Sequence, residues 1–283
     1  MICFPNAKLN LGLAVTSRRS DGYHTLETVF VPLPLHDVLE VEPTEREYDT
    51  LYITSHGYVA EPTNNLVMRA IEAMRTIREL PPLTVALEKH IPAMAGLGGG
   101  SADAAFMLRL LNDRFHLKVE PEEMERLALS LGADCPFFLH NQPAIARGVG
   151  ERLEPLPTDL MQGLFAVVVR PAIDISTPKA YAALGMSVGE TCPGMSANLL
   201  DFLRRGNIKE AARLLSNVFE ERAILEHPRI GILKEELKQE GAFFSLMSGS
   251  GSAVYGLFES ETQAKRASAR ASFADCFVWQ GAF

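Results

Sequence analysis

Residues 92–102 read Pro-Ala-Met-Ala-Gly-Leu-Gly-Gly-Gly-Ser-Ala and place glycines at four of the five positions from 96 to 100. We expect a strand before this loop, over 83–87, and a helix directly after it, over 101–112. Without Cβ atoms, the backbone N–H groups of the loop can approach an anion closely, and the helix adds its unpaired N–H groups and the positive end of its dipole. A tight turn needs fewer glycines, so this loop predicts a polyphosphate site.

The loop differs from two familiar phosphate-binding motifs. No Gly-Lys-Ser/Thr follows at the spacing of a Walker A motif, and Ser101 stands where the dinucleotide fingerprint has its third glycine. A second glycine loop, Ser248-Gly-Ser-Gly-Ser252, joins two expected strands. Alone it is typical of a hairpin turn, and together with the first loop it can complete one site.

The other expected elements mix strands and helices without a strict βαβ order. Turn residues and β-rich runs predict strands over 29–33, 38–42, 51–54, 83–87, 144–153, 164–169, 242–247, 253–259 and 276–280. Apolar periodicity predicts helices over 65–80, 101–112, 121–131, 196–205, 208–222, 228–240 and 261–272. This mixture indicates an α+β fold. The loop 158–163 is the expected boundary between two domains, 1–158 and 159–283.

The composition is that of a folded globular protein. Of its 283 residues, 47% are hydrophobic and 22% are charged, which excludes disorder, collagen and coiled coil. The net charge of −8 argues against nucleic acid or an anionic membrane as the main partner. A few placed groups can still bind a small anion. The longest uncharged stretch, 241–258, is broken by serine and glycine, so it predicts no membrane span.

The cysteines Cys3, Cys135, Cys192 and Cys276 stand far apart. None forms a CxxC pair, which argues against a zinc ribbon or a thioredoxin-like site. The first residues lack the basic segment and apolar run of a secretory signal. We therefore expect reduced thiols and a cytoplasmic protein.

Three motifs occur in the order found in one superfamily of small-molecule kinases. They are Pro5-Asn-Ala-Lys-Leu-Asn10, the loop 92–102 and the loop 248–252, and with them the chain resembles the GHMP kinases. Residues 18–28 (Arg-Arg-Ser-Asp-Gly-Tyr-His-Thr-Leu-Glu-Thr) and 131–136 (Leu-Gly-Ala-Asp-Cys-Pro) narrow the resemblance. They are similar to the members that act on a cytidine-diphosphate-linked methylerythritol, and the similarity runs nearly end to end.

The resemblance implies a fold and a reaction. The fold would have an ATP-binding domain like ribosomal protein S5 domain 2 over 1–158 and a ferredoxin-like GHMP kinase domain over 159–283. The reaction would be ATP-dependent phosphorylation of the 2-hydroxyl of the cytidine-linked alcohol. This step belongs to the non-mevalonate (methylerythritol phosphate) route to isoprenoid precursors.

Two charged residues match the family's catalytic pair. Asp134 resembles the aspartate that accepts the proton of the substrate hydroxyl as the phosphoryl group moves. Lys8 resembles the lysine that keeps this carboxylate ionised and stabilises charge on the phosphoryl group. From spacing alone, Asp134 would be a turn residue and Lys8 a solvated surface lysine. The motifs favour the catalytic roles.

The expected substrate site contains three rings and an amide. Tyr23 and His24 match the cytidine-recognition positions, and Tyr181 matches an aromatic that covers the other face of the base and is often Phe in the family. We expect cytosine between Tyr23 and Tyr181, with His24 hydrogen-bonding its edge. Asn10 faces the same way as Lys8 if both lie in a strand, so it can hydrogen-bond the substrate. A Tyr-His pair with only a structural role is the alternative.

The resemblance also assigns the ATP site, with Mg²⁺ as the expected companion of ATP. The adenine pocket would use Asn65 and Leu66, with Lys89 at its rim, and Ser252 would lie near the transferred phosphate. The residues assigned to the phosphates are Pro92, Ala93, Met94, Ala95, Gly96, Leu97, Gly98, Gly99, Gly100, Ser101 and Ala102. Ala93 departs from a Met of some members. We see no all-protein metal site, and Ser101 is a metal ligand only by analogy.

Two other functions stay open at this point. One is a homoserine- or mevalonate-type GHMP kinase, against which Asp21-Gly-Tyr-His24 argues because those substrates carry no base. The other is a non-catalytic nucleotide-binding regulator of the same fold, against which the presence of both Lys8 and Asp134 argues. We expect a monomer or weak homodimer that binds a small molecule, without nucleic acid or membrane.

Overall fold

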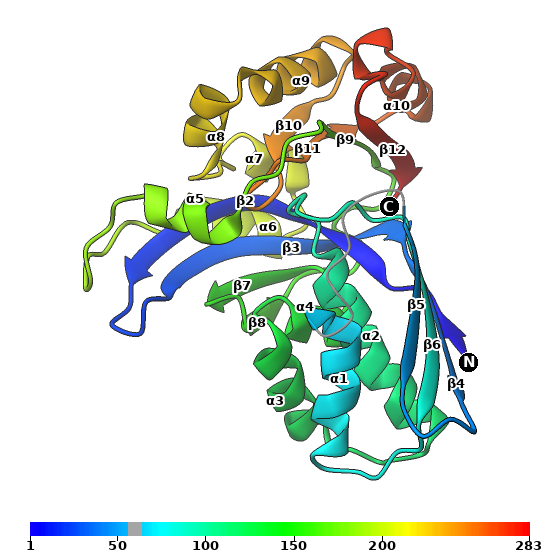
Figure 1. Ribbon diagram of the computed structural model, residues 1–283. Coiled ribbons are helices and arrows are strands. Elements are labelled where there is room, and N and C mark those ends of the chain that lie inside the picture. The colour runs from blue at the N-terminus through cyan, green and yellow to red at the C-terminus, as the bar shows by residue number, and fades with distance from the viewer. Residues whose placement is uncertain (56–63) are drawn as a thin grey trace. The chain divides into compact units, whose positions relative to one another are not determined.

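The computed structural model describes residues 1–55 and 64–283, and the chain forms two compact units whose elements are labelled in Figure 1. The first unit comprises Met1–Ala7, Leu35–Ala93 and Gly98–Asn141. The second unit comprises Lys8–Pro34, Met94–Leu97 and Gln142–Phe283. The chain therefore passes between the units several times, and the predicted boundary at residue 158 falls inside the second unit.

The first unit contains a four-stranded sheet. Its strand order is β1 (Ile2–Cys3), β4 (Val38–Pro43), β6 (Leu83–Lys89) and β5 (Thr50–Ser55). β4 runs antiparallel to β6, whereas β5 runs parallel to it. Along β6 the side chains of Leu83, Val85 and Leu87 are buried and alternate with more exposed ones, so one face of the sheet belongs to the core.

Four helices complete the first unit: α1 (Leu66–Arg75), α2 (Gly99–Arg114), α3 (Pro121–Leu131) and α4 (Cys135–His140). α2 contacts each of the other three, and most of its side chains are buried. The helix predicted over 65–80 ends at Arg75. The backbone N–H groups of Ile77 and Arg78 both bond to the carbonyl of Met74, which closes the helix in a tight turn.

The second unit contains two sheets. In the first, the strand order is β2 (Asn6–Arg18), β3 (His24–His36), β7 (Ala144–Gly148) and β8 (Arg152–Pro155). The single strand predicted over 144–153 is wrong, because the chain reverses between β7 and β8. Gly148 and Gly150 adopt positive φ angles of 73° and 123° there, which glycine tolerates and which a continuous strand does not allow.

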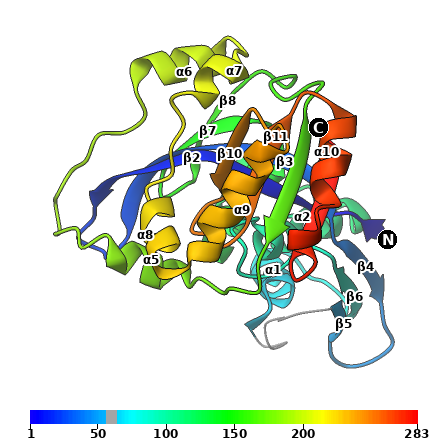
Figure 2. The same ribbon diagram turned by 90° about the horizontal axis from the view of Figure 1, so that it is seen from above.

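The other sheet of the second unit is antiparallel and has the order β10 (Phe244–Met247), β11 (Val254–Phe258), β9 (Phe165–Arg170) and β12 (Phe277–Ala282). Figure 2 shows α9 (Pro228–Gln239) and α10 (Glu261–Ser268) lying along this sheet. Ile230 and Leu233 of α9, Ala264 of α10 and Val167 of β9 share one buried cluster, so both helices cover the sheet with apolar faces. The helix predicted over 261–272 ends at Ser268, before a 3₁₀ turn at Ala271–Phe273.

Four shorter helices, α5 (Thr177–Ala183), α6 (Ala197–Arg204), α7 (Ile208–Ala212) and α8 (Glu220–Glu226), also belong to the second unit. The continuous helix predicted over 208–222 is wrong. The segment between α7 and α8 pairs with β2 instead: the N–H of Leu13 donates to the carbonyl of Ser216 at 2.8 Å, and the N–H of Val218 donates to the carbonyl of Leu13 at 2.9 Å. These bonds to a strand break the helix.

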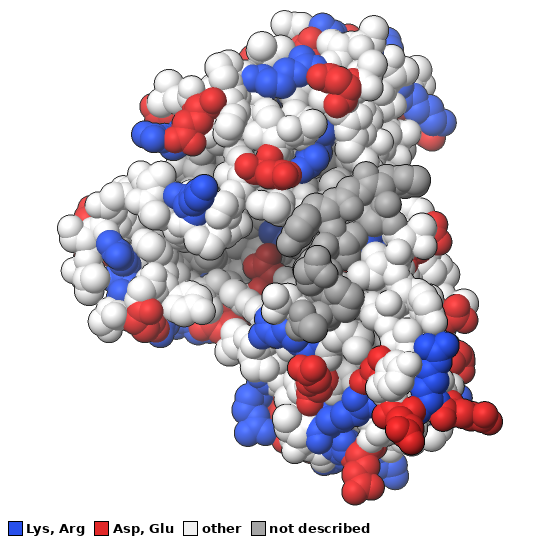
Figure 3. All heavy atoms as spheres, viewed as in Figure 1, with Lys and Arg blue, Asp and Glu red and all other residues white. Residues whose placement is uncertain are grey.

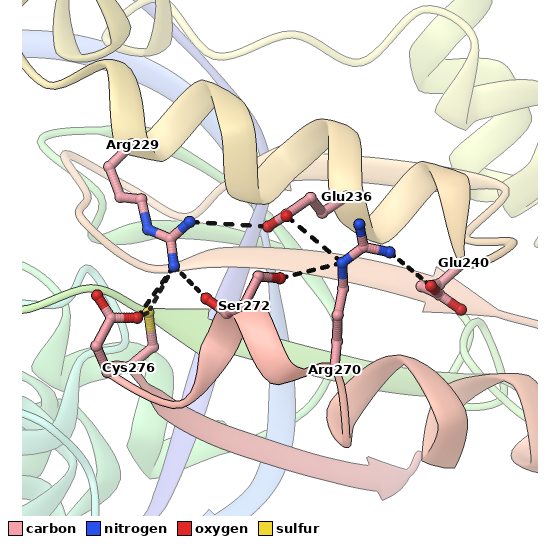
Figure 4. Close-up of polar contacts among 7 residues, drawn as sticks. Arg229, Glu236, Glu240, Arg270, Ser272 and Cys276 are labelled. Carbon is pink, nitrogen blue, oxygen red and sulfur yellow. Dashed lines mark hydrogen bonds and ion pairs between the residues drawn. The ribbon is translucent and has the colours of Figure 1, made fainter.

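Two arginines join α9 to the segment that leads into β12 (Figure 4). Arg229 donates to the carbonyl of Ser272 and pairs with Asp275 at 3.0 Å. Arg270 pairs with Glu240 at 2.6 Å and with Glu236 at 3.4 Å. The network attaches the helix to the sheet edge by charge as well as by apolar contact.

The cysteines form no disulfide: Cys3, Cys135, Cys192 and Cys276 are all free, as the sequence predicts. Among residues 1–55 and 64–283, no helix is both long enough and apolar enough to cross a membrane.

Candidate active site

Segments from all three sequence motifs meet in the second unit. The hydroxyl of Ser248 accepts from the backbone N–H of Asn10 at 3.1 Å and donates to the carbonyl of Gly96 at 2.9 Å. The N–H of Lys8 donates to the carbonyl of Leu97 at 2.9 Å. Residues far apart in the sequence are thereby held within hydrogen-bond distance of one another.

Two glycines of the first loop are required for different reasons. A Cβ atom on Gly96 would lie 2.0 Å from the carbonyl oxygen of Ser248, so only glycine permits this approach of the two loops. Gly98 has φ +74° and forms the N-cap of α2 without a side-chain hydrogen bond. The N–H groups of the first turn of α2 are thus not capped by a side chain, and no acidic residue stands in that turn. This is the geometry of an anion site at a helix N-terminus.

Lys8 is buried in the second unit, with 3% of its surface exposed. Its ammonium donates to the side-chain oxygen of Asn10 and lies 4.9 Å from the ring centroid of Phe30. The alternative of a solvated surface lysine, which is the usual state of lysine, is therefore excluded. Burying an ammonium costs free energy, and buried ionisable groups of this kind are typical of functional sites.

The amide of Asn10 is held in one orientation. Its nitrogen donates to the hydroxyl of Thr28 at 2.9 Å, and that hydroxyl donates to the carbonyl of Gly12 at 2.6 Å. The hydroxyl of Tyr255 donates to the carbonyl of Asn10 at 3.0 Å. The amide oxygen therefore points to Lys8, as alternation along β2 requires.

In the first unit, Asp134 directly precedes α4, a helix that contacts α2. It occupies the N-cap position of α4, but its side chain makes no capping hydrogen bond. A Cβ atom on Gly132 would lie 3.4 Å from the thiol sulfur of Cys135 and 3.8 Å from the hydroxyl oxygen of Ser101. Burial raises the pKa of that thiol to about 12, so Cys135 stays neutral and is no nucleophile.

The residues assigned to adenine lie at the start of α1. Asn65 is buried and caps α1, because its side-chain oxygen accepts from the N–H of Val67 at 2.9 Å. A Cβ atom on Gly100 would lie 3.5 Å from a methyl carbon of Leu66. The N-termini of α1 and α2 are therefore neighbours within the first unit.

Lys89 has two acidic partners. Its ammonium bonds to the carboxylate of Asp37 and, at 2.6 Å, to that of Asp103. Asp37 also accepts from the backbone N–H groups of His90 at 2.6 Å and Ile91 at 2.8 Å. The side chain of Lys89 is only 10% exposed.

The rings assigned to the substrate lie in the second unit. His24 and Tyr181 are in direct contact, with ring centroids 5.0 Å apart and planes tilted by 32°. The ring centroids of Tyr181 and Phe219 lie 4.8 Å apart in a T-shaped arrangement. Tyr23 is 63% exposed, and its N–H donates to Asp21 at 3.1 Å. Burial and the neighbouring Arg18 lower the pKa of His24, so the ring is neutral at pH 7.

Known proteins similar to this chain identify its family. The GHMP kinases N terminal domain matches residues 65–142, and the GHMP kinases C terminal domain matches residues 199–274. The 4-diphosphocytidyl-2-C-methyl-D-erythritol kinase of Porphyromonas gingivalis is 46% identical over 99% of this chain and 98% of its own length. The enzyme of the same name from Parabacteroides distasonis is 44% identical over 99% of both chains. The chain belongs to the 4-diphosphocytidyl-2-C-methyl-D-erythritol kinase family.

Solved structures agree with this assignment. A 4-(cytidine 5'-diphospho)-2C-methyl-D-erythritol kinase superposes over the full length of both chains with a TM-score of 0.79 and 35% identity. A homoserine kinase from Cytophaga hutchinsonii reaches a TM-score of 0.67 at 15% identity, which shows a shared fold alone. The predicted α+β GHMP kinase fold and the resemblance are confirmed, and the two matched segments fall on either side of residue 158.

Three buried polar residues next to the proposed site, Asp37, Asp103 and Asn217, were not predicted from the sequence. Asp37 and Asp103 hold Lys89, and Asn217 holds the second glycine loop, because its side-chain nitrogen donates to the carbonyls of Met247 and Gly249 at 2.8 Å each. Asn217 lay in a segment predicted as helix, so nothing in the sequence indicated its contacts.

Ser252, which the resemblance assigns to a place near the transferred phosphate, is enclosed by the protein. Ser252 is fully buried and donates its hydroxyl to the carbonyl of Ile173. Its hydroxyl therefore supports the turn in this structure, and a role at the transferred phosphate stays a prediction.

Proposed function

We propose that this protein transfers the γ-phosphate of ATP to the 2-hydroxyl of 4-(cytidine 5'-diphospho)-2-C-methyl-D-erythritol and releases the 2-phosphate and ADP. The full-length similarity to kinases of that name carries the proposal. The meeting of the three motif segments at Ser248 supports it from the structure.

Asp134 is the proposed general base. A hydroxyl becomes a competent nucleophile as its proton passes to a nearby carboxylate, while the phosphoryl group is transferred through a transition state rich in negative charge. The match of its motif, Leu131-Gly-Ala-Asp-Cys-Pro136, to the family supports this role, and Gly132 of the same segment lies beside Ser101 of α2.

Lys8 is the proposed electrostatic partner in the transfer. A buried ammonium acts in a medium of low dielectric constant, where it stabilises developing negative charge more strongly than in water. The amide of Asn10 fixes the position of the ammonium by accepting one of its hydrogen bonds. Its proposed contact with the substrate would use the same amide.

The proposed phosphate site is the loop 92–102 with the uncapped first turn of α2. ATP is the expected donor in a GHMP kinase, and Mg²⁺ would neutralise charge on its β- and γ-phosphates. In the described part of the chain, no group of three or more acidic, His or Cys side chains could hold a metal. We propose that Mg²⁺ would bind mainly through the phosphates of ATP, with the hydroxyl of Ser101 as the proposed protein ligand.

Tyr23, His24 and Tyr181 are the proposed cytosine site. A neutral imidazole offers one donor and one acceptor, which match the mixed edge of cytosine. Because the ring of His24 already rests on Tyr181, a base stacked on that face of Tyr181 would displace His24. His24 would then turn its edge to the base, as the sequence analysis predicts.

The surface supports a small-molecule partner. On the face drawn in Figure 3, basic and acidic side chains are interspersed, and no broad basic area is seen there. The net charge of −8 also argues against nucleic acid as a partner, and the absence of such a partner stays a prediction. Cytoplasmic location and a monomer or weak homodimer stay predictions.

A coupled assay of ADP release tests the proposed function. ATP turnover should depend on the cytidine-linked alcohol and stay near background without it. Turnover that is the same with and without this alcohol would contradict the proposal.

A further inference from the structure

Three buried ionisable side chains meet in the first unit, next to residues that flank the proposed phosphate loop. Asp37 lies between β3 and β4, Lys89 ends β6, and Asp103 lies in the second turn of α2. Asp37 is fully buried, and Asp103 is 2% exposed. We call these residues the Asp37–Lys89–Asp103 cluster.

The cluster contacts the chain at both ends of the loop. On the entering side, one carboxylate oxygen of Asp37 accepts from the N–H groups of His90 and Ile91. On the leaving side, a Cβ atom on Gly99 would lie 2.9 Å from Ile91 and 3.3 Å from the ammonium of Lys89. Gly99 is the first residue of α2, so Lys89 of the cluster lies next to the helix start that would bind the phosphates.

We propose that the Asp37–Lys89–Asp103 cluster positions the phosphate loop for ATP binding by fastening residues 90 and 91 to the first turns of α2, with Asp37 as the main positioning residue. This inference rests on the proposed function only in that ATP is the ligand.

The cost of the cluster indicates a purpose beyond stability. Two carboxylates and one ammonium are buried together, and one oxygen of Asp103 has no hydrogen-bond partner within the described residues. Apolar residues of similar volume usually stabilise a core as well as buried charges do. The glycines of the loop have no side chains through which the core could hold them, so a fixed anchor beside them restricts their conformations.

The test compares Asp37 with a matched acid at the other end of β6. Asp49 accepts from the N–H of Leu83 at 2.8 Å and pairs with Arg75, in the same unit as Asp37. Asp37→Ala should weaken ATP binding at least about tenfold by calorimetry and raise the KM for ATP, while the KM for the alcohol stays within about twofold. Asp49→Ala should lower the melting temperature and leave ATP affinity within about twofold.

A conservative variant of Asp37 distinguishes its hydrogen bonds to the backbone from the effect of its negative charge. Asp37→Asn keeps an oxygen that can accept from His90 and Ile91, so its ATP affinity should stay within about threefold of wild type. If Asp37→Ala does not melt cooperatively, Asp103→Ala replaces it. This variant keeps both backbone bonds of Asp37 and severs the link to α2, and it should weaken ATP binding at least about threefold.

Unchanged ATP affinity in a folded Asp37→Ala or Asp103→Ala protein overturns the proposal, as does an equal loss of ATP affinity in Asp49→Ala. Calorimetry with ATP needs no second substrate. If wild-type protein binds ATP but does not phosphorylate the cytidine-linked alcohol, the proposed function fails and this comparison still decides the role of the cluster.

Discussion

Two buried polar side chains of β2, those of Lys8 and Asn10, are proposed functional groups of the second unit. The ammonium of Lys8 donates to the amide of Asn10, and the nitrogen of that amide donates to Thr28 of β3. The hydroxyl of Tyr255 of β11 donates to the backbone carbonyl of Asn10. Such an arrangement lowers the conformational freedom of the ammonium before any ligand arrives. The proposed catalytic groups, Lys8 and Asp134, can each be tested by a single substitution.

Replacing Asp134 by Asn should cut turnover by about 100-fold or more, because the amide cannot accept the hydroxyl proton. ATP affinity should stay nearly unchanged, since the backbone of the phosphate loop is untouched. Steady-state kinetics and calorimetry on the same preparation check both parts. A purified Asp134→Asn protein with near-normal turnover would remove Asp134 from the base role.

The cytosine site makes a second residue-scale prediction. Stacking on an aromatic ring contributes about 1–3 kcal/mol per base. Tyr181→Ala should therefore raise the apparent constant for the cytidine substrate roughly 5- to 150-fold, with the ATP constant within about twofold. His24→Ala should act likewise and reduce discrimination between cytidine and uridine diphosphate substrates.

Kinetics for both substrates separate the alternatives. If the ATP constant moves in these variants while the cytidine-substrate constant does not, His24 and Tyr181 serve the core or the nucleotide site. The contacts of Tyr181 with Phe219 make the core role a real alternative, so the melting temperature of each variant is measured alongside.

Residues that stand in local sequence motifs were predicted better than residues whose role depends on partners far away in the sequence. Lys8 and Asp134 stand in motifs, and alternation along a strand was enough to place Asn10 beside Lys8. Asp37 was missed because its partner Lys89 is 52 residues away, and no local signal marks a turn residue as a buried acid. The direct contact of His24 with Tyr181 also depends on packing between distant segments.

At the scale of elements, the first glycine loop carries the strongest constraint. Gly98→Val should abolish ATP binding, because a β-branched side chain resists the φ angle of +74° and blocks the approach of phosphate. Gly163 is a matched control, since it has φ +78° with open space around it.

Calorimetry distinguishes the two variants. Gly163→Val should suffer the backbone strain and keep ATP affinity within about twofold. Equal ATP affinity in folded Gly98→Val and wild-type proteins would refute the phosphate site at this helix start.

Helices whose ends are marked by local residues such as proline were predicted with accurate bounds. α3 begins at Pro121, with Glu122 and Glu123 in its first turn, and it spans the predicted 121–131. Predictions failed where long-range pairing overrides local preference. The segment after α7 leaves the helix to bond with Leu13, and the predicted strand 144–153 folds into a hairpin at glycines with positive φ.

At the scale of the whole molecule, stability should depend on pH through Asp103. Burial raises its pKa from 3.8 to about 7, although Lys89 opposes the shift and Asp37 adds to it. The folded state therefore binds the proton more tightly than the unfolded state. Tighter proton binding stabilises the folded state at low pH. This stabilisation is lost as the pH rises from about 4 to 7, so the free energy of unfolding falls over that range, and above 7 the loss is complete. Burial raises the pKa of the nearby Cys3 thiol to about 12, so Cys3 does not titrate in this range.

Urea unfolding of wild type and Asp103→Asn at pH 5 and pH 8 measures this effect. The variant carries no titrating group there, so its stability relative to wild type should be greater at pH 8 than at pH 5. The same difference at both pH values would show that Asp103 does not titrate between them.

The central claim concerns substrate and reaction together, and one competition experiment addresses both. The protein is given ATP, Mg²⁺ and equal concentrations of the cytidine-diphosphate-linked methylerythritol, mevalonate and homoserine, and the products are followed by ³¹P NMR. We predict a single new phosphomonoester, on the 2-hydroxyl of the cytidine-linked alcohol, formed together with ADP. Phosphorylation of mevalonate or homoserine in its place, or of none of the three, would contradict the account.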